Sequence, residues 1–202
     1  MTAVEFWFEF ASTYSYPAAM RVERVAAEAG ADVVWRPFLL GPVFAKQGLT
    51  DSPFNVFEAK GRYMWRDLER ICAADGLRFQ KPAVFPQNGL TAARLTLAGL
   101  DEEWGADFAR AVYRANFADG LPISDPDVLR TLVAGVGADA DAAMERASSP
   151  EIKERLKAQT ERAWEKGVFG APSFTVEDEL FWGNDRMEAA FAWAKAPPAS
   201  SV

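Results

Sequence analysis

Two stretches near the two ends of the chain decide its fold. The first, Val4-Glu5-Phe6-Trp7-Phe8-Glu9-Phe10, is aromatic and β-branched, which is typical of a strand. Its even positions are all apolar, so Glu5 and Glu9 indicate a less buried face. The second, Gly167-Val168-Phe169-Gly170-Ala171-Pro172-Ser173-Phe174, leads through a proline into another strand-like run. We expect the two stretches to meet in one folded unit and to form a small site there.

The sequence after the first strand predicts a β-α-β unit. Residues 12–30 predict a helix with Pro17 in or just after its first turn and Gly30 at its end. Residues 32–38 predict a second strand, in which Pro37 indicates an edge position or a strand end. This order normally gives a parallel pair of strands with a right-handed crossover.

The middle of the chain changes in character. Residues 41–55 are rich in Gly, Pro and polar residues and predict an irregular segment. Asp125-Pro126 and Ser149-Pro150 are good helix starts, because a capping side chain stands directly before a proline. The helices that the pattern predicts are 57–75, 89–99, 102–117, 125–135, 139–147 and 150–166.

Strand signals return near the end of the chain. Residues 173–176 and 179–182 flank Glu177-Asp178, which predicts a β-hairpin. Residues 185–194 predict a final amphipathic helix. The order is therefore β-α-β, a helical block, and β-β-α.

Without the helical block, this is the order of a thioredoxin fold. We therefore predict the α/β class: a thioredoxin-like fold with a large all-helical insertion. The predicted division gives residues 1–45 and 167–195 to the thioredoxin-like domain, 46–166 to the insertion and 196–202 to a disordered tail. The seam between the first two parts is a natural place for a pocket.

Composition excludes several classes of function. A net charge of −7 argues against a non-specific nucleic-acid binder. No secretory signal or membrane-length apolar run is visible, so no membrane partner and a cytoplasmic location are expected. The single cysteine, Cys72, excludes a Cys-x-x-Cys redox pair and reads as a small core residue. The chain has no histidine, which excludes the usual catalytic triads and most catalytic zinc sites, and no metal site is predicted.

Ser12 and Pro172 are the first candidate site residues, and each has two readings. Ser12 either caps a helix or donates a hydrogen bond to a bound thiolate; without a nearby base it is a poor nucleophile. Pro172 either begins a strand or is a cis-proline that leaves the Ala171 amide and carbonyl free for a peptide-like ligand.

A third candidate is Trp182-Gly183-Asn184-Asp185-Arg186, where a strand ends and a helix begins. In one interpretation, Asn184 or Asp185 only caps that helix. In the other, the backbone amides at the start of the helix bind a carboxylate while Asp185 pairs with an ammonium group. A γ-glutamyl group carries both charges on one carbon. Among the aromatic residues, Phe44, Phe85 and Trp182 lie in segments that can reach a pocket. Asp67 and Arg70 form a plausible pair on a charged helix face.

Together these motifs carry a family resemblance. The chain resembles the 2-hydroxychromene-2-carboxylate isomerases in several sequence signatures, which occur in the same order. They lie at residues 8–16, 60–68, 85–88, 167–172 and 181–186. Those proteins belong with the kappa-class glutathione transferases in the DsbA-like thioredoxin superfamily. The resemblance covers nearly the whole chain, up to about Trp193. Thr13 stands where the family often has proline, and Ala171 stands where a larger aliphatic residue is commoner.

The resemblance implies both a cofactor and a reaction. It implies a serine in place of the redox cysteine, with glutathione bound by Ser12, by the backbone at Ala171 before Pro172, and by the loop Trp182, Gly183, Asn184 and Asp185. Ser12 would hold glutathione as the thiolate, which adds reversibly to an aromatic pyruvate-type substrate during cis–trans isomerisation, as in naphthalene breakdown. Phe44, Asn55 and Asn88 are candidate contacts for that acidic substrate, and a homodimer is implied.

Two alternatives stay open at this point. One is a kappa-like glutathione transferase or peroxidase that acts on other electrophiles. The other is a non-enzymatic thioredoxin-like module that binds a partner peptide at the edge formed by Ala171 and Pro172.

Overall fold

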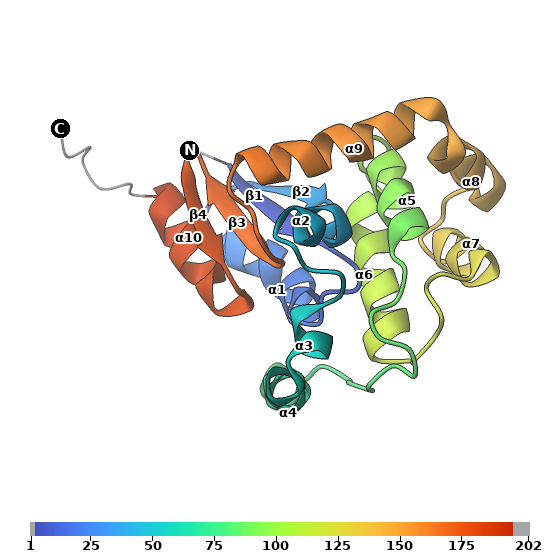
Figure 1. Cartoon of the computed structure of the whole chain (residues 1–202). Helices are drawn as coiled ribbons and strands as arrows, with labels where there is room; N and C mark the ends of the chain where they lie inside the picture. The colour runs from blue at the N-terminus through green and yellow to red at the C-terminus, as the bar shows by residue number, and fades with distance from the viewer. Residues whose placement is uncertain (1–2, 196–202) are drawn as a thin grey trace.

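A four-stranded mixed sheet organises the molecule. In the computed structural model, which describes residues 3–195, the strand order is β2-β1-β3-β4 (Figure 1). β1 (Val4–Phe8) pairs in parallel with β2 (Val33–Pro37) and antiparallel with β3 (Ser173–Val176), which pairs in turn with β4 (Glu179–Trp182). The edge position and strand end predicted from Pro37 are confirmed, because β2 is an edge strand whose last residue is Pro37.

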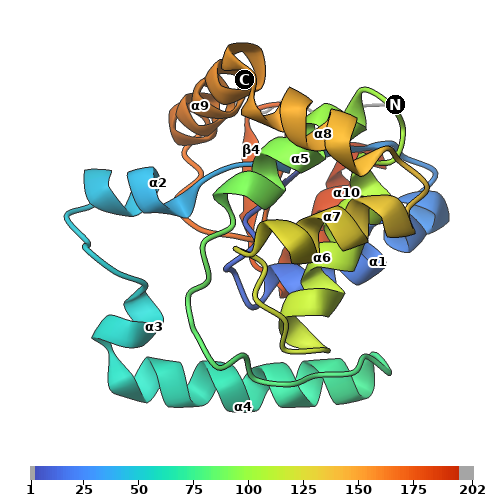
Figure 2. The same ribbon diagram turned by 90° about the vertical axis from the view of Figure 1, so that its right-hand side faces the viewer.

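Helices cover both faces of the sheet. α1 (Ser15–Ala29) connects β1 to β2 and packs with α10 (Met187–Lys195) on one face, while α9 (Pro150–Glu165) lies against the other (Figure 1). The remaining helices are α2 (Leu40–Lys46), α3 (Pro53–Val56), α4 (Glu58–Ala74), α5 (Leu90–Leu100), α6 (Gly105–Phe117), α7 (Pro126–Gly135) and α8 (Ala140–Ser148). α2 and α3 lead from the sheet to α4, which lies along the lower edge of Figure 2.

The helices on both sides bury both faces of β1. Phe6 and Phe8 pack in the main core with α1, α6 and α10, whereas Trp7 packs with Phe38 and with residues of α2 and α9. The prediction of a less buried face at Glu5 and Glu9 is only partly right, because Glu5 is the one residue of β1 that is not buried, whereas Trp7 on the same face and Glu9 are buried. Glu5 is enclosed by ion pairs, and Glu9 is 8% exposed. A strand covered by helices on both sides loses the alternation that a half-exposed strand shows.

Most predicted helices are present with small shifts at their ends. α1 begins at Ser15 rather than at residue 12, because residues 9–12 form a turn in which the Ser12 amide donates to the Glu9 carbonyl over 3.0 Å. Gly30 ends α1 as predicted, with a left-handed φ of 67°. The prediction of an irregular segment over residues 41–55 is wrong where α2 and α3 form. Ser52 caps α3 by accepting from the Phe54 amide.

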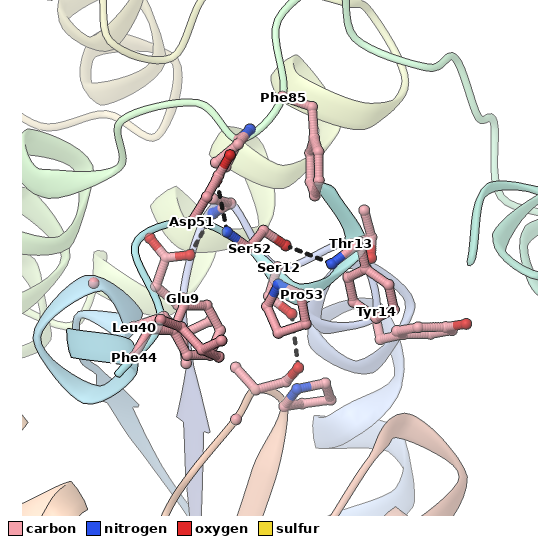
Figure 3. A pocket seen from close by; sticks show the side chains of 18 of the residues that line it. Glu9, Ser12, Thr13, Tyr14, Leu40, Phe44, Asp51, Ser52, Pro53 and Phe85 are labelled. Atoms are coloured by element: carbon pink, nitrogen blue, oxygen red, sulfur yellow. Dashed lines mark hydrogen bonds between the residues drawn. The ribbon is translucent and has the colours of Figure 1, made fainter. Parts of the chain in front are cut away.

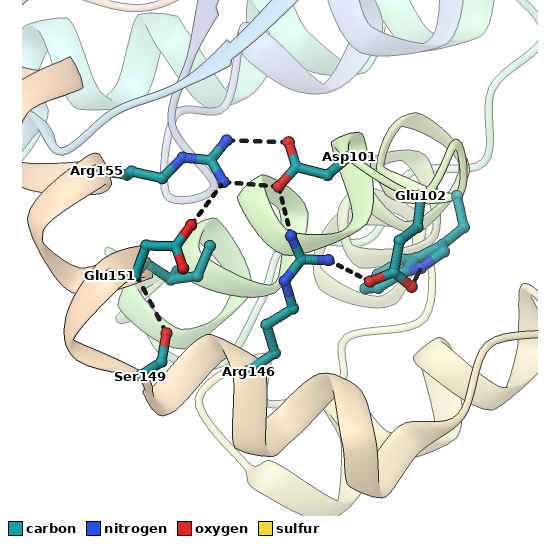
Figure 4. Close-up of polar contacts among 8 residues, drawn as sticks. Asp101, Glu102, Arg146, Ser149, Glu151 and Arg155 are labelled. Carbon is teal, nitrogen blue, oxygen red and sulfur yellow. Dashed lines mark hydrogen bonds and ion pairs between the residues drawn. The ribbon is translucent and has the colours of Figure 1, made fainter.

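An ion-pair network joins three helices of the predicted insertion (Figure 4). Asp101, which follows α5, accepts from Arg146 of α8 at 2.6 Å and from Arg155 of α9 at 2.6 and 3.1 Å. Arg146 also donates to Glu102. Because Arg155 engages both oxygens of one carboxylate, the pair has the bidentate geometry that makes arginine contacts specific. The network ties the end of α5 to α8 and α9.

The division into a thioredoxin-like domain (1–45 and 167–195) and a helical insertion (46–166) stays a prediction. The tail predicted at 196–202 lies outside the described residues. No helix within residues 3–195 is both long enough and apolar enough to cross a membrane.

Candidate functional site

A cavity of about 1350 Å³ lies between the sheet and the α2–α4 segment. Its walls come from the turn after β1, from α2 and the segment that leads into α3, from the inner face of α4, and from the loop before α5. The stretches before β3 and after β4 complete it. Figure 3 shows how side chains of these segments face one space. The cavity exceeds the usual size of a small-molecule pocket, so it has room for two ligands side by side.

Ser12 and Ala171 form the floor of this cavity. The Ser12 hydroxyl donates to the Ala171 carbonyl oxygen over 2.8 Å (Figure 3). The peptide bond between Ala171 and Pro172 is cis. Ser12 does not cap α1, because Tyr14 occupies the cap position and makes no side-chain cap bond. The prediction that the amide and the carbonyl of Ala171 are both unpaired is wrong for the carbonyl, because this oxygen accepts a hydrogen bond from the Ser12 hydroxyl.

The loop after β4 is positioned by α1. Gly183 adopts φ 117°, and its amide donates to the Pro172 carbonyl over 2.9 Å. The next residues form a short 3-10 turn, η1 (Asn184–Arg186), before α10 begins. Arg21 of α1 donates to the backbone and side-chain oxygens of Asn184 at 3.2 and 3.1 Å. Asn184 therefore anchors the loop, and Asp185 stays exposed and pairs with Arg186 at 3.1 Å.

The structure brings together all but one of the site residues predicted from the sequence. Those that line the cavity are Ser12, Phe44, Asn88, Ala171, Pro172, Trp182, Gly183, Asn184 and Asp185. Asn55 does not line the cavity. Its side-chain amide instead donates to the Asp51 carboxylate and to the Phe85 carbonyl. Asn88 lines the cavity while its side-chain oxygen accepts from the Leu90 amide at the start of α5.

The sequence prediction missed Glu9, which also lines the cavity. Its Oε2 accepts from the Ala11 amide over 2.8 Å. Burial raises the pKa of this carboxyl to about 7, although hydrogen bonds from the Ala11 and Ser12 amides oppose the shift. The available signal was its position, because Glu9 is the first residue after β1 and stands three residues before Ser12.

A second missed feature is the hydroxyl of Thr13. Thr13 is buried and lines the cavity, and its Oγ1 has no hydrogen-bond partner among the described residues. A buried hydroxyl without a partner is rare, because its desolvation is not compensated. The same turn therefore holds two hydroxyl groups, Ser12 and Thr13, only one of which has an acceptor.

The cavity is poor in positive charge. Among its lining residues within 3–195, Lys60 of α4 is the only lysine or arginine, whereas Asp51, Asp67 and Asp185 are acidic. Tyr14 donates to Asp67 over 3.0 Å, and the predicted pair between Asp67 and Arg70 is present at 3.8 Å.

Cys72 lies in the main core and does not line the cavity. This position confirms the prediction of a small core residue, and burial raises the pKa of its thiol to about 12.

Comparison with known proteins agrees with this architecture. The family model of the DsbA-like thioredoxin domain matches residues 3–191. The chain is 31% identical to a 2-hydroxychromene-2-carboxylate isomerase of Sphingobium xenophagum, over 92% of this chain and 94% of that protein. It is 26% identical to glutathione S-transferase kappa 2 of Caenorhabditis elegans, over 91% and 88% of the two chains.

A solved structure of a 2-hydroxychromene-2-carboxylate isomerase superposes with a TM-score of 0.85 at 26% identity, covering 94% of this chain and 93% of the other. The resemblance seen in the sequence motifs is thus confirmed over the whole fold, and so is the predicted thioredoxin-like class. The chain belongs to the DsbA-like thioredoxin domain family and, within it, to the isomerase enzymes related to 2-hydroxychromene-2-carboxylate isomerase.

Proposed function

We propose that this chain is a glutathione-dependent cis–trans isomerase of 2-hydroxychromene-2-carboxylate or a similar aromatic pyruvate-type compound. The observation that carries the proposal is the Ser12 hydroxyl, held 2.8 Å from the Ala171 carbonyl inside the cavity. The only sulfur nucleophile of the chain, Cys72, is buried elsewhere. A thiol for the reaction must therefore come from a bound molecule.

The residues present fit glutathione. The unpartnered Oγ1 of Thr13 is a buried group that a ligand atom can satisfy. The Ala171 backbone offers strand-like pairing to a peptide, and the loop of Asn184 and Asp185 offers backbone amides and a carboxylate to the γ-glutamyl end. In this arrangement the cofactor is held by Ser12, Ala171, Pro172, Trp182, Gly183, Asn184 and Asp185.

When bound, glutathione supplies a thiol whose reversible addition lets a conjugated double bond of the substrate rotate. Ser12 exchanges its acceptor, turning its hydroxyl from the Ala171 carbonyl to the sulfur. This exchange is favourable, because a hydrogen bond to a charged group contributes about 1.5–3 kcal/mol against about 0.5–1.5 kcal/mol for a neutral one. It also frees the Ala171 carbonyl to accept from the peptide. The chain thus contributes orientation and charge stabilisation.

The aromatic part of the substrate has several apolar side chains to pack against in the cavity. Leu40 and Phe44 of α2 lie on one side of Ser12, and Phe85 of the loop before α5 lies on another (Figure 3). Asn88 also lines the cavity. Lys60 is the group that can attract the substrate's carboxylate.

The decisive experiment replaces Ser12 and measures isomerisation of chromene carboxylate at saturating glutathione. Ser12→Ala should lower kcat by about 10- to 100-fold, because one hydrogen bond to a charged sulfur is lost. Ser15→Ala is the matched control, since Ser15 is buried in α1 and does not line the cavity. An unchanged kcat in Ser12→Ala would remove the role given to the hydroxyl, and a wild-type rate independent of glutathione would sink the proposal.

The relation to the kappa-class proteins favours a second candidate, a transferase that uses the same bound thiol on other electrophiles. Turnover of a chloronitrobenzene-type acceptor without turnover of chromene carboxylate would favour it. The non-enzymatic alternative is not favoured, because the relatives that the chain matches over most of its length are isomerases and transferases. The homodimer implied by the resemblance stays a prediction, which sedimentation of the purified protein would check.

A further inference from the structure

The cavity contains a carboxyl group that the proposed reaction has not yet used. Glu9 is 8% exposed, lines the cavity and begins the turn that carries Ser12. One oxygen, Oε2, accepts from the Ala11 amide over 2.8 Å, while the Ser12 amide donates to the Glu9 backbone carbonyl over 3.0 Å. The carboxyl is thus fixed to the same short loop that presents the Ser12 hydroxyl.

The surroundings hold Glu9 in place without neutralising it. Tyr113 of α6 donates to its backbone carbonyl over 2.9 Å. At Gly89 an added Cβ would lie 3.2 Å from Oε1 and 2.8 Å from the Phe10 Cβ, so the glycine lets the start of α5 approach the carboxyl closely. Within residues 3–195, no arginine or lysine forms an ion pair with Glu9.

A carboxylate that is only 8% exposed and a thiolate bound in the same cavity repel each other. The presence of one charge therefore raises the pKa of the other group. The ordinary pKa of a cysteine thiol is about 8.5 and that of a glutamate about 4.5, which makes an ordinary glutamate a poor acceptor for a thiol proton. Burial raises the pKa of Glu9 to about 7 and brings the two groups close to a match.

We propose that Glu9 is the proton acceptor of the site: it takes up at Oε1 the proton that the thiol of glutathione gives up on binding beside Ser12. This inference rests on the proposed function. The S–H bond breaks, the O–H bond forms at Glu9, and the negative charge passes from the carboxylate to the sulfur, so that the net charge of the cavity does not change. Glu9 returns the proton when glutathione leaves as the free thiol.

Other ionisable groups also face the cavity and need to be separated from Glu9. They are Tyr14 after β1, Asp51 before α3, Lys60, Tyr63 and Asp67 on α4, and Asp185 in η1. Tyr113 touches Glu9 from α6, but burial raises its pKa well above the ordinary tyrosine value, so it stays protonated near neutral pH. A variant of Glu9 itself is therefore required.

The test counts protons during glutathione binding. Calorimetric titrations are run in buffers of different ionisation enthalpy at about pH 8, above the pKa of Glu9 and below that of the free thiol, while the ultraviolet absorbance of the thiolate is followed. Wild type, Glu9→Gln and Glu5→Gln are compared, with S-methylglutathione as the baseline. The Glu9→Gln side chain keeps an oxygen for the Ala11 amide, and Glu5 is the glutamate within β1 and does not line the cavity.

Wild type and Glu5→Gln should form thiolate with almost no proton released to the buffer. Glu9→Gln should either release about one proton per thiolate formed or fail to form thiolate; both results support the assignment. Release of about one proton by wild type overturns it, even if the Glu9 variant does not fold. The assignment is also overturned if wild type and Glu9→Gln form the same amount of thiolate and both release almost no protons to the buffer. A wild type that binds no glutathione refutes the proposed function itself, which keeps the two failures distinct.

Discussion

Arg21 in the second turn of α1 donates to both the backbone carbonyl and the side-chain oxygen of Asn184, at 3.2 and 3.1 Å. The same guanidinium pairs with Glu188 of α10 at 2.5 Å, and its side chain is only 16% exposed. The loop proposed to hold the γ-glutamyl end of glutathione is therefore anchored by the helix that follows Ser12, in addition to the bond from the Gly183 amide to the Pro172 carbonyl.

We expect Arg21→Met to raise the KM for glutathione while kcat at saturation stays close to the wild-type value. The substitution frees the loop but leaves the groups near the sulfur in place. Hydrogen bonds of charged groups are worth about 1.5–3 kcal/mol, so a rise of about tenfold or more is expected. Arg24→Met, on an exposed position of the same helix, should leave KM unchanged. A kcat effect without a KM effect would contradict this account.

Thr13→Val should weaken glutathione binding by about fivefold if the Thr13 hydroxyl serves the ligand, since a neutral hydrogen bond contributes about 1 kcal/mol. The free protein should not lose stability, because Oγ1 has no partner among the described residues. Calorimetry and thermal unfolding of the same samples provide both measurements. Equal affinity combined with a higher Tm would mean that the hydroxyl is only an uncompensated polar group.

Lys60→Met should raise the KM for an anionic substrate by about two- to fivefold, because exposed charge interactions are worth about 0.2–1 kcal/mol. The effect should shrink as salt is added, since screening weakens interactions between exposed charges. Arg62→Met is the control on the same helix, as Arg62 pairs with Glu58 and does not line the cavity. A neutral electrophile should show no dependence on Lys60, and equal effects on both substrates would exclude an electrostatic role.

Cys72→Ala should retain full glutathione-dependent activity and lose about 1 kcal/mol of stability, as expected for the loss of a small buried group. In the folded wild type, the thiol should resist iodoacetamide near neutral pH, because Cys72 is fully buried and its pKa is raised to about 12. Labelling with and without denaturant, read by mass spectrometry, checks this. Loss of activity in Cys72→Ala would contradict the assignment of an external thiol.

The carboxyl of Glu9 makes stability depend on pH in a predictable direction. Its pKa is about 7 in the folded protein, against an ordinary value of 4.5, so the folded state holds the proton more tightly than the unfolded state between these values. The protein should therefore lose roughly 3 kcal/mol of this contribution as the pH rises from about 4.5 through 7. Glu9→Gln should match wild type at low pH and be the more stable protein above pH 7. Parallel unfolding curves at every pH would refute the raised pKa.

Local sequence signals predicted most of the fold. The hairpin strands at residues 173–176 and 179–182 appear with the predicted bounds, because two strand-like runs flank a two-residue turn. Asp125 and Ser149 cap α7 and α9 as the Asp-Pro and Ser-Pro signals predict. The same kind of signal, Ser52-Pro53, stands at the start of α3, inside the segment whose polar composition predicted irregular structure.

The features that the sequence did not predict depend on contacts between segments that are distant in the chain. The burial of Glu9 requires Gly89, just before α5, and Tyr113 of α6 to pack against the end of β1, and no local pattern contains that information. The bond from Ser12 to the Ala171 carbonyl joins residues separated by the whole helical block. Asn55 was placed in the site because of its loop, but its side chain bonds to Asp51 and so belongs to the support of that loop.

The pairing of β1 with both β2 and β3 has a consequence for biosynthesis. During translation, β1 emerges early and can at first pair only with β2, because the hairpin that contains its other partner, β3, is made near the end of the chain, just before α10. An unpaired strand edge is prone to association with other chains. A ribosome that stops before residue 171 thus releases a polypeptide with an open sheet and half a pocket, so premature termination should yield aggregates rather than partially active enzyme.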